Sequence, residues 1–404
     1  MGDILFIAHR IPFPPNRGDK IRSWNVLKHL GTLSRVHLAC FADDAADAAH
    51  LADLRAAMGG SLGEAHVEVR RKSKFQAAAE ALRDGKPISL TAFDSPNLRR
   101  FVGRMLENGG IDTIYTFSGQ MAQFVPTGAR QRRVMDLVDV DSAKFGAYGG
   151  KGPMRWIHRR EAARLADFER EAAARSDAVL LVSPDEADLF RERSGATNVH
   201  AVSNGIDLTF YSPRGDYEPL PPSEHPLLVF TGQMDYRPNV EAVCDFADKV
   251  LPIVLEKRPD VRFAIVGRKP APAVRRLADR RNIVVTGDVP DVRSWLAAAD
   301  IAVAPLGIAR GIQNKVLEAM AMGRPVVASA AAFHGINAVP GRDLIVADRP
   351  ESQAWHILDL LTHPQEAAEV GAAARRRMET RYRWDAQLAP LAALLGRAPR
   401  LAAA

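Results

Sequence analysis

Short, uninterrupted apolar runs alternate along this chain with longer segments of mixed polarity, and this alternation constrains the fold more than any other feature. The first run, Ile4–Ala8, is followed by a Pro- and Gly-containing loop and by a segment of helical composition from about Asp19 to Leu30. Continuous apolar runs of this length are typical of strands buried on both faces of a parallel sheet. Similar runs follow at Val36–Phe41, Ile111–Phe117, Val134–Val138, Ala178–Val182 and Val199–Val202. Strands separated by helices predict right-handed βαβ units and an α/β fold.

A proline-rich stretch divides the chain into two such series. Residues 212–226 are too rich in proline for a regular element and stiff enough to act as a spacer, since they include Pro213, Pro219, Pro221, Pro222 and Pro226. The alternation then restarts, at Leu227–Thr231, Arg262–Val266, Ile283–Thr286, Ile301–Ala304, Pro325–Ala328 and Leu344–Val346. At 404 residues the chain also exceeds what one hydrophobic core usually organises. We therefore expect a domain over residues 1–212, a linker over 213–226 and a second α/β domain over 227–383.

The composition is that of an ordinary globular protein with interleaved charges. The formal net charge is only +6, which argues against a nucleic-acid partner. Two distant cysteines, Cys40 and Cys244, cannot form a disulfide framework or a cysteine zinc site, and the histidines, His363 included, show no metal-ligand spacing. The first residues lack the features of a signal peptide, and no stretch approaches the length of a membrane span. These features predict a cytoplasmic protein.

One region departs from this charge balance. Residues 68–104 contain more Lys and Arg than Asp and Glu, and a second basic stretch, Lys151–Arg160, includes Trp156. Charge runs are usually solvated faces. The alternative is contact with an anionic surface on the inner face of the plasma membrane, and the sequence leaves both interpretations open.

The segment Gly311–Ala328 is the most informative for chemistry. It reads GIQNKVLEAMAMGRPVVA and follows an expected strand and a glycine-containing loop. Its first residues, Gly311, Ile312 and Asn314, lie at the expected start of a helix, where free N–H groups and the positive dipole end suit a diphosphate. Lys315 would add a full positive charge there.

Glu318 lies in the same helix among apolar neighbours. An ionised carboxylate in such surroundings must have a partner that offsets its desolvation. A ribose diol, which donates two hydroxyls to the two carboxylate oxygens, is one such partner. A local ion pair with Lys315, three residues earlier on the same face, is the other.

The same segment resembles the nucleotide-sugar signature of the retaining glycosyltransferases of family 4, which have the GT-B fold. In that family the Glu of the Glu-Ala-Met-Ala-x-Gly-x-Pro-Val-Val stretch binds the donor ribose, which implies this role for Glu318. Three further segments resemble the family's Pro-Asn-Gly-Val-Asp turn, its phosphate-binding loop and its base-pocket loop; they are Val202–Asp207, Phe230–Asn239 and Val285–Val292, which contains Val289. The segment Ala8–Arg22 is similar to sugar transferases associated with exosortase (PEP-CTERM) exopolysaccharide loci.

The resemblance implies a GT-B architecture, in which two Rossmann-like domains have parallel sheets that face a central cleft, and residues 384–404 cross back to the first domain. It implies a retaining glycosyltransferase that moves a sugar from a nucleoside-diphosphate donor to a glycan or lipid-linked acceptor in exopolysaccharide biosynthesis. No metal or other cofactor is then required, because Lys315 and helix N–H groups neutralise the diphosphate. A nucleotide-sugar epimerase of the same fold and a catalytically inactive nucleotide-sugar-binding protein are the alternatives.

The chain departs from the family pattern at several positions. Many family members have an acidic residue eight positions before the ribose Glu, and this chain has Arg310 there. The Arg and Lys of the family's phosphate loop are replaced by Gln233 and Asn239. We expect Gly232 in the phosphate loop to contact the donor. The basic residues left to neutralise the diphosphate are Arg237 and Lys315. The family's first-domain His has no clear counterpart.

Two segments of the first domain are candidates for the remaining contacts. In the loop after the first strand, Gly18 would let the backbone approach a ligand and Lys20 would add charge; the alternative is a turn capped by Asp19. Asp139 and Asp141 follow a predicted strand, so we expect them at its carboxyl end, facing the cleft. There they would orient the acceptor hydroxyl or stabilise charge on the sugar, and their Asp-x-Asp spacing keeps a metal alternative open.

Overall fold

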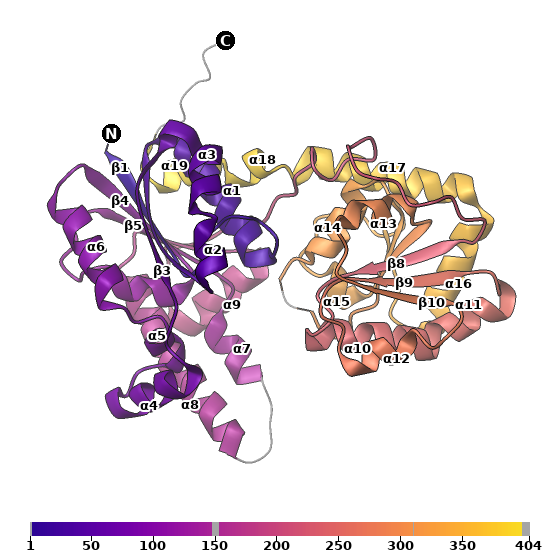
Figure 1. The fold of residues 1–404 in the computed structure, drawn as a ribbon, viewed down its shortest axis with the longest axis horizontal. Coiled ribbons are helices and arrows are strands. Elements are labelled where there is room, and N and C mark those ends of the chain that lie inside the picture. The colour runs from indigo at the N-terminus through magenta and orange to yellow at the C-terminus, as the bar shows by residue number, and fades with distance from the viewer. Residues whose placement is uncertain (1, 148–152, 310, 398–404) are drawn as a thin grey trace, which may run out of the picture. The chain divides into compact units, whose positions relative to one another are not determined.

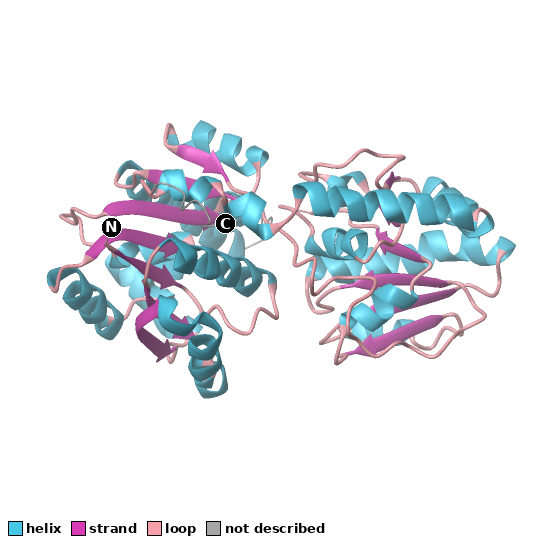
Figure 2. Cartoon of the chain, turned by 90° about the horizontal axis from the view of Figure 1, so that it is seen from above, coloured by secondary structure: helices cyan, strands magenta, loops and turns pink. Residues whose placement is uncertain are grey.

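A computed structural model describes residues 2–147, 153–309 and 311–397. The chain divides into two compact units. The first runs to Ser203 and includes the chain again from Leu388, and the second is Asn204–Gln387. Each unit is a parallel sheet covered by helices (Figure 1, Figure 2). The predicted α/β class is thus confirmed.

The first unit is built on a seven-stranded sheet with the strand order β3-β2-β1-β4-β5-β6-β7. The strands are β1 (Asp3–Ala8), β2 (Val36–Ala42), β3 (Leu62–Val69), β4 (Ile111–Phe117), β5 (Arg132–Val138), β6 (Ala178–Leu181) and β7 (Val199–Ala201). The helices are α1 (Gly18–Leu33), α2 (Ala45–Ala49), α3 (Leu51–Met58), α4 (Lys74–Asp84), α5 (Ile88–Ala92), α6 (Pro96–Glu107), α7 (Asp141–Ala147), α8 (Pro153–Ala174), α9 (Pro184–Ser194) and α19 (Pro390–Leu394). The strand order reverses between β1 and β4, and ligands of open α/β sheets bind at the carboxyl ends of strands beside such a reversal.

The second unit has a six-stranded sheet with the order β10-β9-β8-β11-β12-β13, which reverses between β8 and β11. Its strands are β8 (Leu227–Thr231), β9 (Arg262–Val266), β10 (Ile283–Gly287), β11 (Ile301–Ala304), β12 (Val326–Ala328) and β13 (Ile345–Val346). Its helices are α10 (Arg237–Asp245), α11 (Leu251–Lys257), α12 (Pro272–Leu277), α13 (Val292–Ala298), α14 (Asn314–Ala321), α15 (Ala330–Phe333), α16 (Pro350–Thr362) and α17 (Pro364–Arg381). Helix α18 (Trp384–Leu388) runs across the division between the units. Among the described residues of the chain, no helix is both long and apolar enough to cross a membrane.

A buried ionic group joins a helix to two strands in the core of the first unit. The Arg22 guanidinium donates to the Asp136 carboxylate at 3.1 Å from Nε and 3.2 Å from Nη2. The Tyr115 hydroxyl donates to the same carboxylate at 2.8 Å. Because buried charges must be paired and hydrogen-bonded, this group fixes α1 against β4 and β5.

The proline-rich stretch packs on the second unit. Arg375 of α17 donates to the carbonyl oxygen of Tyr211 at 2.6 Å and to that of Leu208 at 3.3 Å. Ser294 of α13 donates to the Glu218 carbonyl at 2.5 Å. Residues 204–226, which include the segment expected as a linker, therefore form part of the compact second unit.

The end of the described chain packs on the first unit. Leu391 and Leu395 are almost fully buried. Arg132 of β5 donates to the Leu394 carbonyl at 2.6 Å, and Arg397 donates to the Gly2 carbonyl at 3.0 Å and to the carboxylate of Asp112. These contacts hold α19 beside the amino ends of the β-strands.

Candidate functional site

Two glycines set the backbone at the carboxyl end of β8. The Gly232 N–H donates to the Val266 carbonyl at 3.0 Å. A Cβ atom added to Gly267, the residue after β9, would lie 1.7 Å from the Gly232 carbonyl oxygen. The close approach of these two turns therefore excludes a side chain at Gly267.

Three residues from separate elements meet beside this turn. The Lys315 ammonium at the start of α14 donates to Asn239 Oδ1 of α10 at 2.5 Å, and Asn239 Nδ2 donates to the Gln233 carbonyl at 2.9 Å. A Cβ atom on Gly232 would lie 3.3 Å from Lys315 Nζ and 2.8 Å from Asn239 Nδ2. The Lys315 ammonium also lies 4.3 Å from the centroid of the Phe230 ring, a cation–π contact. We call Gly232, Asn239 and Lys315 the lysine cluster.

The charge of Lys315 is poorly solvated in this cluster. Burial lowers the pKa of Lys315 to about 7, although the charge of Glu318 raises it. An anion placed beside the ammonium would favour the charged form and so raise this pKa again. The cluster is therefore suited to an anionic ligand.

Glu318 is held by a tyrosine that the sequence analysis did not single out. Burial raises the pKa of Glu318, whereas the neighbouring Tyr211 hydroxyl and the charge of Lys315 lower it. No ion pair within 4.0 Å joins Lys315 and Glu318 among the residues described. Each group thus has a polar partner of its own, Asn239 for Lys315 and Tyr211 for Glu318.

The first turn of α14 has the form expected of an anion-binding helix start. Gly311 adopts a left-handed conformation with φ of 61°, and Ile312 is buried. The N-cap residue Gln313 makes no side-chain capping bond, so the first N–H groups of the helix at Asn314 can donate to a ligand. Arg310 lies outside the described residues.

Two predicted donor contacts are not brought to the lysine cluster. The Arg237 side chain is 85% exposed, and its Nε donates to Glu241 one turn along α10 at 2.7 Å. Val289, in the loop after β10, is partly buried and packs on the hydrophobic core of the second unit. The structure gives no contact between either residue and Lys315.

In the first unit, Gly18 and Lys20 lie in the first turn of α1. Gly18 is exposed, but Lys20 is only 4% exposed and forms an ion pair with Asp47. Arg17, in the same loop, pairs with Asp19 at 2.7 Å. The positive charge that we expected to face a ligand here is thus taken up by carboxylates of the same unit, which sequence spacing cannot show because Asp47 lies on another helix.

A histidine–aspartate pair follows β1. His9 Nε2 lies 3.1 Å from Asp19 Oδ2, which also accepts a hydrogen bond from Arg10 at 2.8 Å. Burial alone would raise the pKa of Asp19, but the hydrogen bond from His9 and the charges of Arg10 and Arg17 hold it well below its usual range. His9 Nδ1 is buried and has no hydrogen-bond partner among the described residues. A histidine directly after a predicted strand is a signal that the sequence analysis missed.

Asp139 and Asp141 are brought together after β5. Lys144 donates to Asp139 Oδ2 at 2.8 Å and to Asp141 Oδ1 at 3.1 Å. Burial alone would lower the pKa of Lys144, but the two carboxylates raise it above its usual range. The residue before this pair, Val138, has a φ of 71°, a strained conformation for a β-branched side chain. The two carboxylates are therefore held in place and share one ammonium ion.

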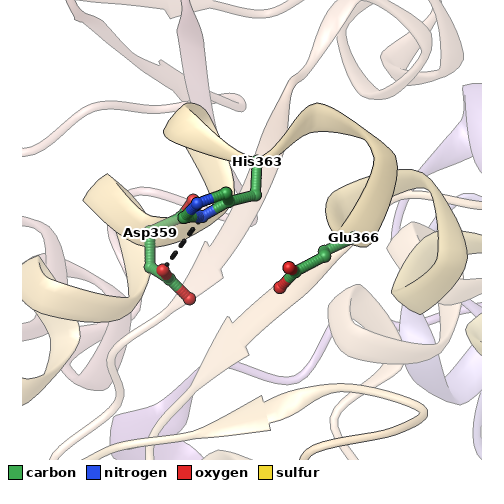
Figure 3. Close-up of side chains that lie close together, drawn as sticks. All are labelled: Asp359, His363 and Glu366. Carbon is green, nitrogen blue, oxygen red and sulfur yellow. Dashed lines mark hydrogen bonds and ion pairs between the residues drawn. The ribbon is translucent and has the colours of Figure 1, made fainter.

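A different group of possible metal ligands lies between α16 and α17. Ligand atoms of Asp359, His363 and Glu366 lie within 4.8 Å of one another (Figure 3). His363 Nδ1 lies 3.0 Å from the Asp359 carbonyl oxygen and 3.1 Å from its carboxylate. This hydrogen bonding at the end of α16 is that of a helix C-cap, and it accounts for the position of His363 beside Asp359.

Two family models match the chain, each over a different unit. A model described as "Glycosyl transferases group 1" matches residues 225–363, which contain the lysine cluster and Glu318. A model described as "Glycosyl transferase 4-like domain" matches residues 65–205, which contain Asp139 and Asp141.

Individual relatives and solved structures agree with these models. A GDP-mannose-dependent alpha-(1-6)-phosphatidylinositol dimannoside mannosyltransferase of Mycobacterium tuberculosis is 31% identical over 252 residues, which cover 59% of this chain and 63% of that protein, less than two thirds of its length. A GDP-mannose-dependent alpha-(1-6)-phosphatidylinositol monomannoside mannosyltransferase of Mycolicibacterium smegmatis is 26% identical over 310 residues, which cover 67% and 80%. The structure of Anabaena HepE in complex with UDP and glucose has a TM-score of 0.67 at 16% identity and covers 98% of this chain and 100% of that one. This likeness confirms the expected GT-B fold.

Proposed function

We propose, from the premise that the chain belongs to the GT-B glycosyltransferases, that this protein is a retaining glycosyltransferase with a nucleoside-diphosphate sugar as donor. The observation that carries the proposal is the pair of poorly solvated charges on α14, Lys315 and Glu318, beside the glycine turn at Gly232. A diphosphate would restore the charged form of Lys315, and a ribose diol would satisfy the Glu318 carboxylate. One ligand of this class uses both groups together.

The donor residues would act chiefly on the leaving group. When the bond between the sugar and the diphosphate breaks, negative charge develops on the diphosphate oxygens. Lys315 and the N–H groups at Asn314 would stabilise that charge, and Asn239 would hold the Lys315 ammonium in position. Gly311 lets the backbone turn so that these N–H groups point at the ligand.

We assign the acceptor to the first unit. Asp139 and Asp141 would orient the acceptor hydroxyl or stabilise positive charge on the sugar, and their shared Lys144 would hold both carboxylates in position. Gly18 remains a candidate for close approach of the backbone to the ligand. The ion pairs of Lys20 and Arg237 do not support direct donor contacts for these two residues.

The relatives suggest which substrates to test first. Several of them are named GDP-mannose-dependent and act on phosphatidylinositol mannosides, so we propose a GDP-activated hexose as donor and a lipid-linked acceptor. The resemblance of Ala8–Arg22 to exopolysaccharide transferases supports a role in exopolysaccharide biosynthesis at the inner face of the plasma membrane.

A thermal-shift panel of GDP-, UDP-, ADP- and dTDP-sugars tests the proposal, because a ligand stabilises the fold in proportion to its affinity. We expect one nucleotide class to raise the melting temperature of the wild type but not that of the Lys315→Met variant. The stabilising sugar is then incubated with lipid-linked acceptors, with and without EDTA, and transfer is expected in both cases. Conversion of the donor without any acceptor would instead indicate an epimerase, and binding without conversion an inactive protein.

A further inference from the structure

Helix α4 presents its large apolar side chains to solvent and its small ones to the protein. Phe75 is 90% exposed and Leu82 is 58% exposed, and they lie seven residues apart on one face of the helix. Ala77 and Ala81, on the opposite face, are fully buried, and Thr91 of α5 donates to the Ala77 carbonyl at 2.8 Å. A surface helix normally buries its large apolar residues. In α4 the large apolar residues face solvent instead.

A third exposed apolar side chain lies at the same corner of the first unit. Trp156, in the first turn of α8, is 60% exposed. One turn later, Arg160 donates to the Ala81 carbonyl at 2.7 Å and to the Lys86 carbonyl at 3.2 Å, which joins the start of α8 to the end of α4 (Figure 1). Phe75, Leu82 and Trp156 are the exposed large apolar side chains of the described part of this unit. We call them the α4–α8 corner.

The charges around this corner are predominantly positive. Lys86, Arg155 and Arg159 are exposed and form no ion pair with the residues described. The nearby carboxylates of Glu80 and Asp84 are bound by Lys72 at 2.7 Å and by Arg83 at 2.8 Å.

Elsewhere in the basic stretch 68–104 several of the charges are paired with carboxylates of the same unit. Arg70 pairs with Asp43, Arg99 with Asp94 and Arg104 with Glu64. The basic stretch seen in the sequence is therefore not one continuous positive face. Among its described residues, Arg71, Lys86 and Arg100 are exposed and form no ion pair, and Lys86 is the one that follows α4 directly.

We propose that the α4–α8 corner docks this protein on an anionic phospholipid bilayer. Phe75, Leu82 and Trp156 enter the boundary between headgroups and acyl chains, and Lys86, Arg155 and Arg159 contact lipid phosphates. Exposed aromatic and aliphatic side chains ringed by cations suit this surface, which is apolar below and anionic above. None of these residues belongs to the lysine cluster, so variants of the corner leave the proposed donor contacts unchanged.

The test is flotation of the full-length protein with phosphatidylcholine vesicles that contain or lack phosphatidylglycerol. We expect binding to the anionic vesicles only, and at least a roughly tenfold loss of partitioning in the double variant Phe75→Ser/Leu82→Ser, because burial of such side chains supplies the binding energy. Trp355→Ser is the matched control for Trp156→Ser, since Trp355 is 61% exposed but lies in the second unit. Only the Trp156 change should weaken binding. Circular dichroism and donor-induced thermal shifts should be unchanged in all these variants.

Depth of insertion separates docking by these apolar residues from adsorption by charge alone. Lipids brominated near the headgroup should quench tryptophan emission of the wild type, and Trp156→Phe should lose most of this quenching while it still binds. The proposal is overturned if high salt abolishes binding while Phe75→Ser/Leu82→Ser binds normally, which would indicate a purely electrostatic surface. The proposal is equally overturned if the wild-type protein does not bind either kind of vesicle. Sedimentation experiments that show self-association through the corner would also overturn it.

Discussion

At the scale of single residues, the lowered pKa of Lys315 predicts that binding of the proposed donor depends on pH. Burial lowers this pKa to about 7, so the free protein loses the Lys315 proton as the pH rises through 7. A bound diphosphate favours the charged amine, and binding must then take up a proton above that pH. The contribution of Lys315 to donor affinity should be constant below pH 7. Above that pH, donor affinity should fall by at most about tenfold per pH unit.

Isothermal titration calorimetry in two buffers of different ionisation enthalpy measures this proton uptake directly. We expect uptake at about pH 8 that is absent in Lys315→Met, which should also bind the donor more weakly at low pH. Affinity that stays flat from about pH 6 to 9 in the wild type, together with unchanged affinity in Lys315→Met, would show that Lys315 does not face the diphosphate.

Glu318 is expected to bind the donor ribose through its two carboxylate oxygens. Glu318→Ala should lower donor affinity roughly 10- to 100-fold, because hydrogen bonds to a charged group are lost. Glu318→Gln keeps one acceptor oxygen and should lose less. Tyr211→Phe serves as the control, since it removes only the internal partner of the carboxylate. Calorimetry that found equal donor affinity in Glu318→Ala and the wild type would exclude the ribose contact.

The candidate residues could be predicted only where the signal is local in the chain. Lys315 and Glu318 stand out because a helix start and an apolar neighbourhood are visible in neighbouring residues. Tyr211 could not be found in this way, since its partner Glu318 lies on a distant element. For the same reason the sequence suggests a free charge at Lys20, whereas the fold supplies Asp47 as its partner.

At the scale of elements, the site depends on the close approach of the turns after β8 and β9. Gly267→Ala should destabilise the second unit by about 1–3 kcal/mol, because the new methyl group would collide with the Gly232 carbonyl and the backbone must move. Gly103→Ala in α6 is the control, since its Cβ meets no atom within 4 Å, and it should be neutral or slightly stabilising. Urea unfolding monitored for both variants distinguishes them. Equal stability of Gly267→Ala and wild type would contradict the tight packing of these turns.

The strands differ in how well the sequence predicts them. Runs such as Ile4–Ala8 form strands buried on both faces, where every residue must be apolar, so their signal is strong. Strand β3 is not predicted from the sequence; it is an edge strand in which Glu64, His66 and Glu68 alternate with smaller apolar residues. An edge strand needs fewer apolar residues because part of it faces solvent, and a run-based criterion misses it.

At the scale of the whole molecule, composition gives the number of units but not their limits. Proline content marks residues 213–226 as irregular, yet a hydrogen bond from Ser294 to the Glu218 carbonyl holds this segment on the second unit, and Arg375 holds Tyr211 just before it. Whether an irregular segment is a free linker or packs on a domain depends on side chains elsewhere in the chain. Local composition therefore does not predict whether such a segment packs on a domain.

The C-terminal segment ties the stability of the first unit to the last residues described. Truncation after Gln387 leaves the second unit, Asn204–Gln387, complete but removes the burial of Leu391 and Leu395 and the bonds to Leu394 and Arg397. Loss of the two leucines alone should destabilise the first unit by about 3–6 kcal/mol. We therefore expect calorimetry to show a lower melting transition for the first unit, with donor binding by the second unit retained and transfer activity lost.

A pair of point variants tests the same coupling without shortening the chain. Leu391→Ser places a hydroxyl in a fully buried position, whereas Ala393→Ser changes an exposed position of the same helix. Only the first should lower the melting temperature of the first unit, because only it loses apolar burial. If Leu391→Ser melted like the wild type, or if the truncated protein transferred sugar at the full rate, α19 would not be part of the structural core on which transfer depends.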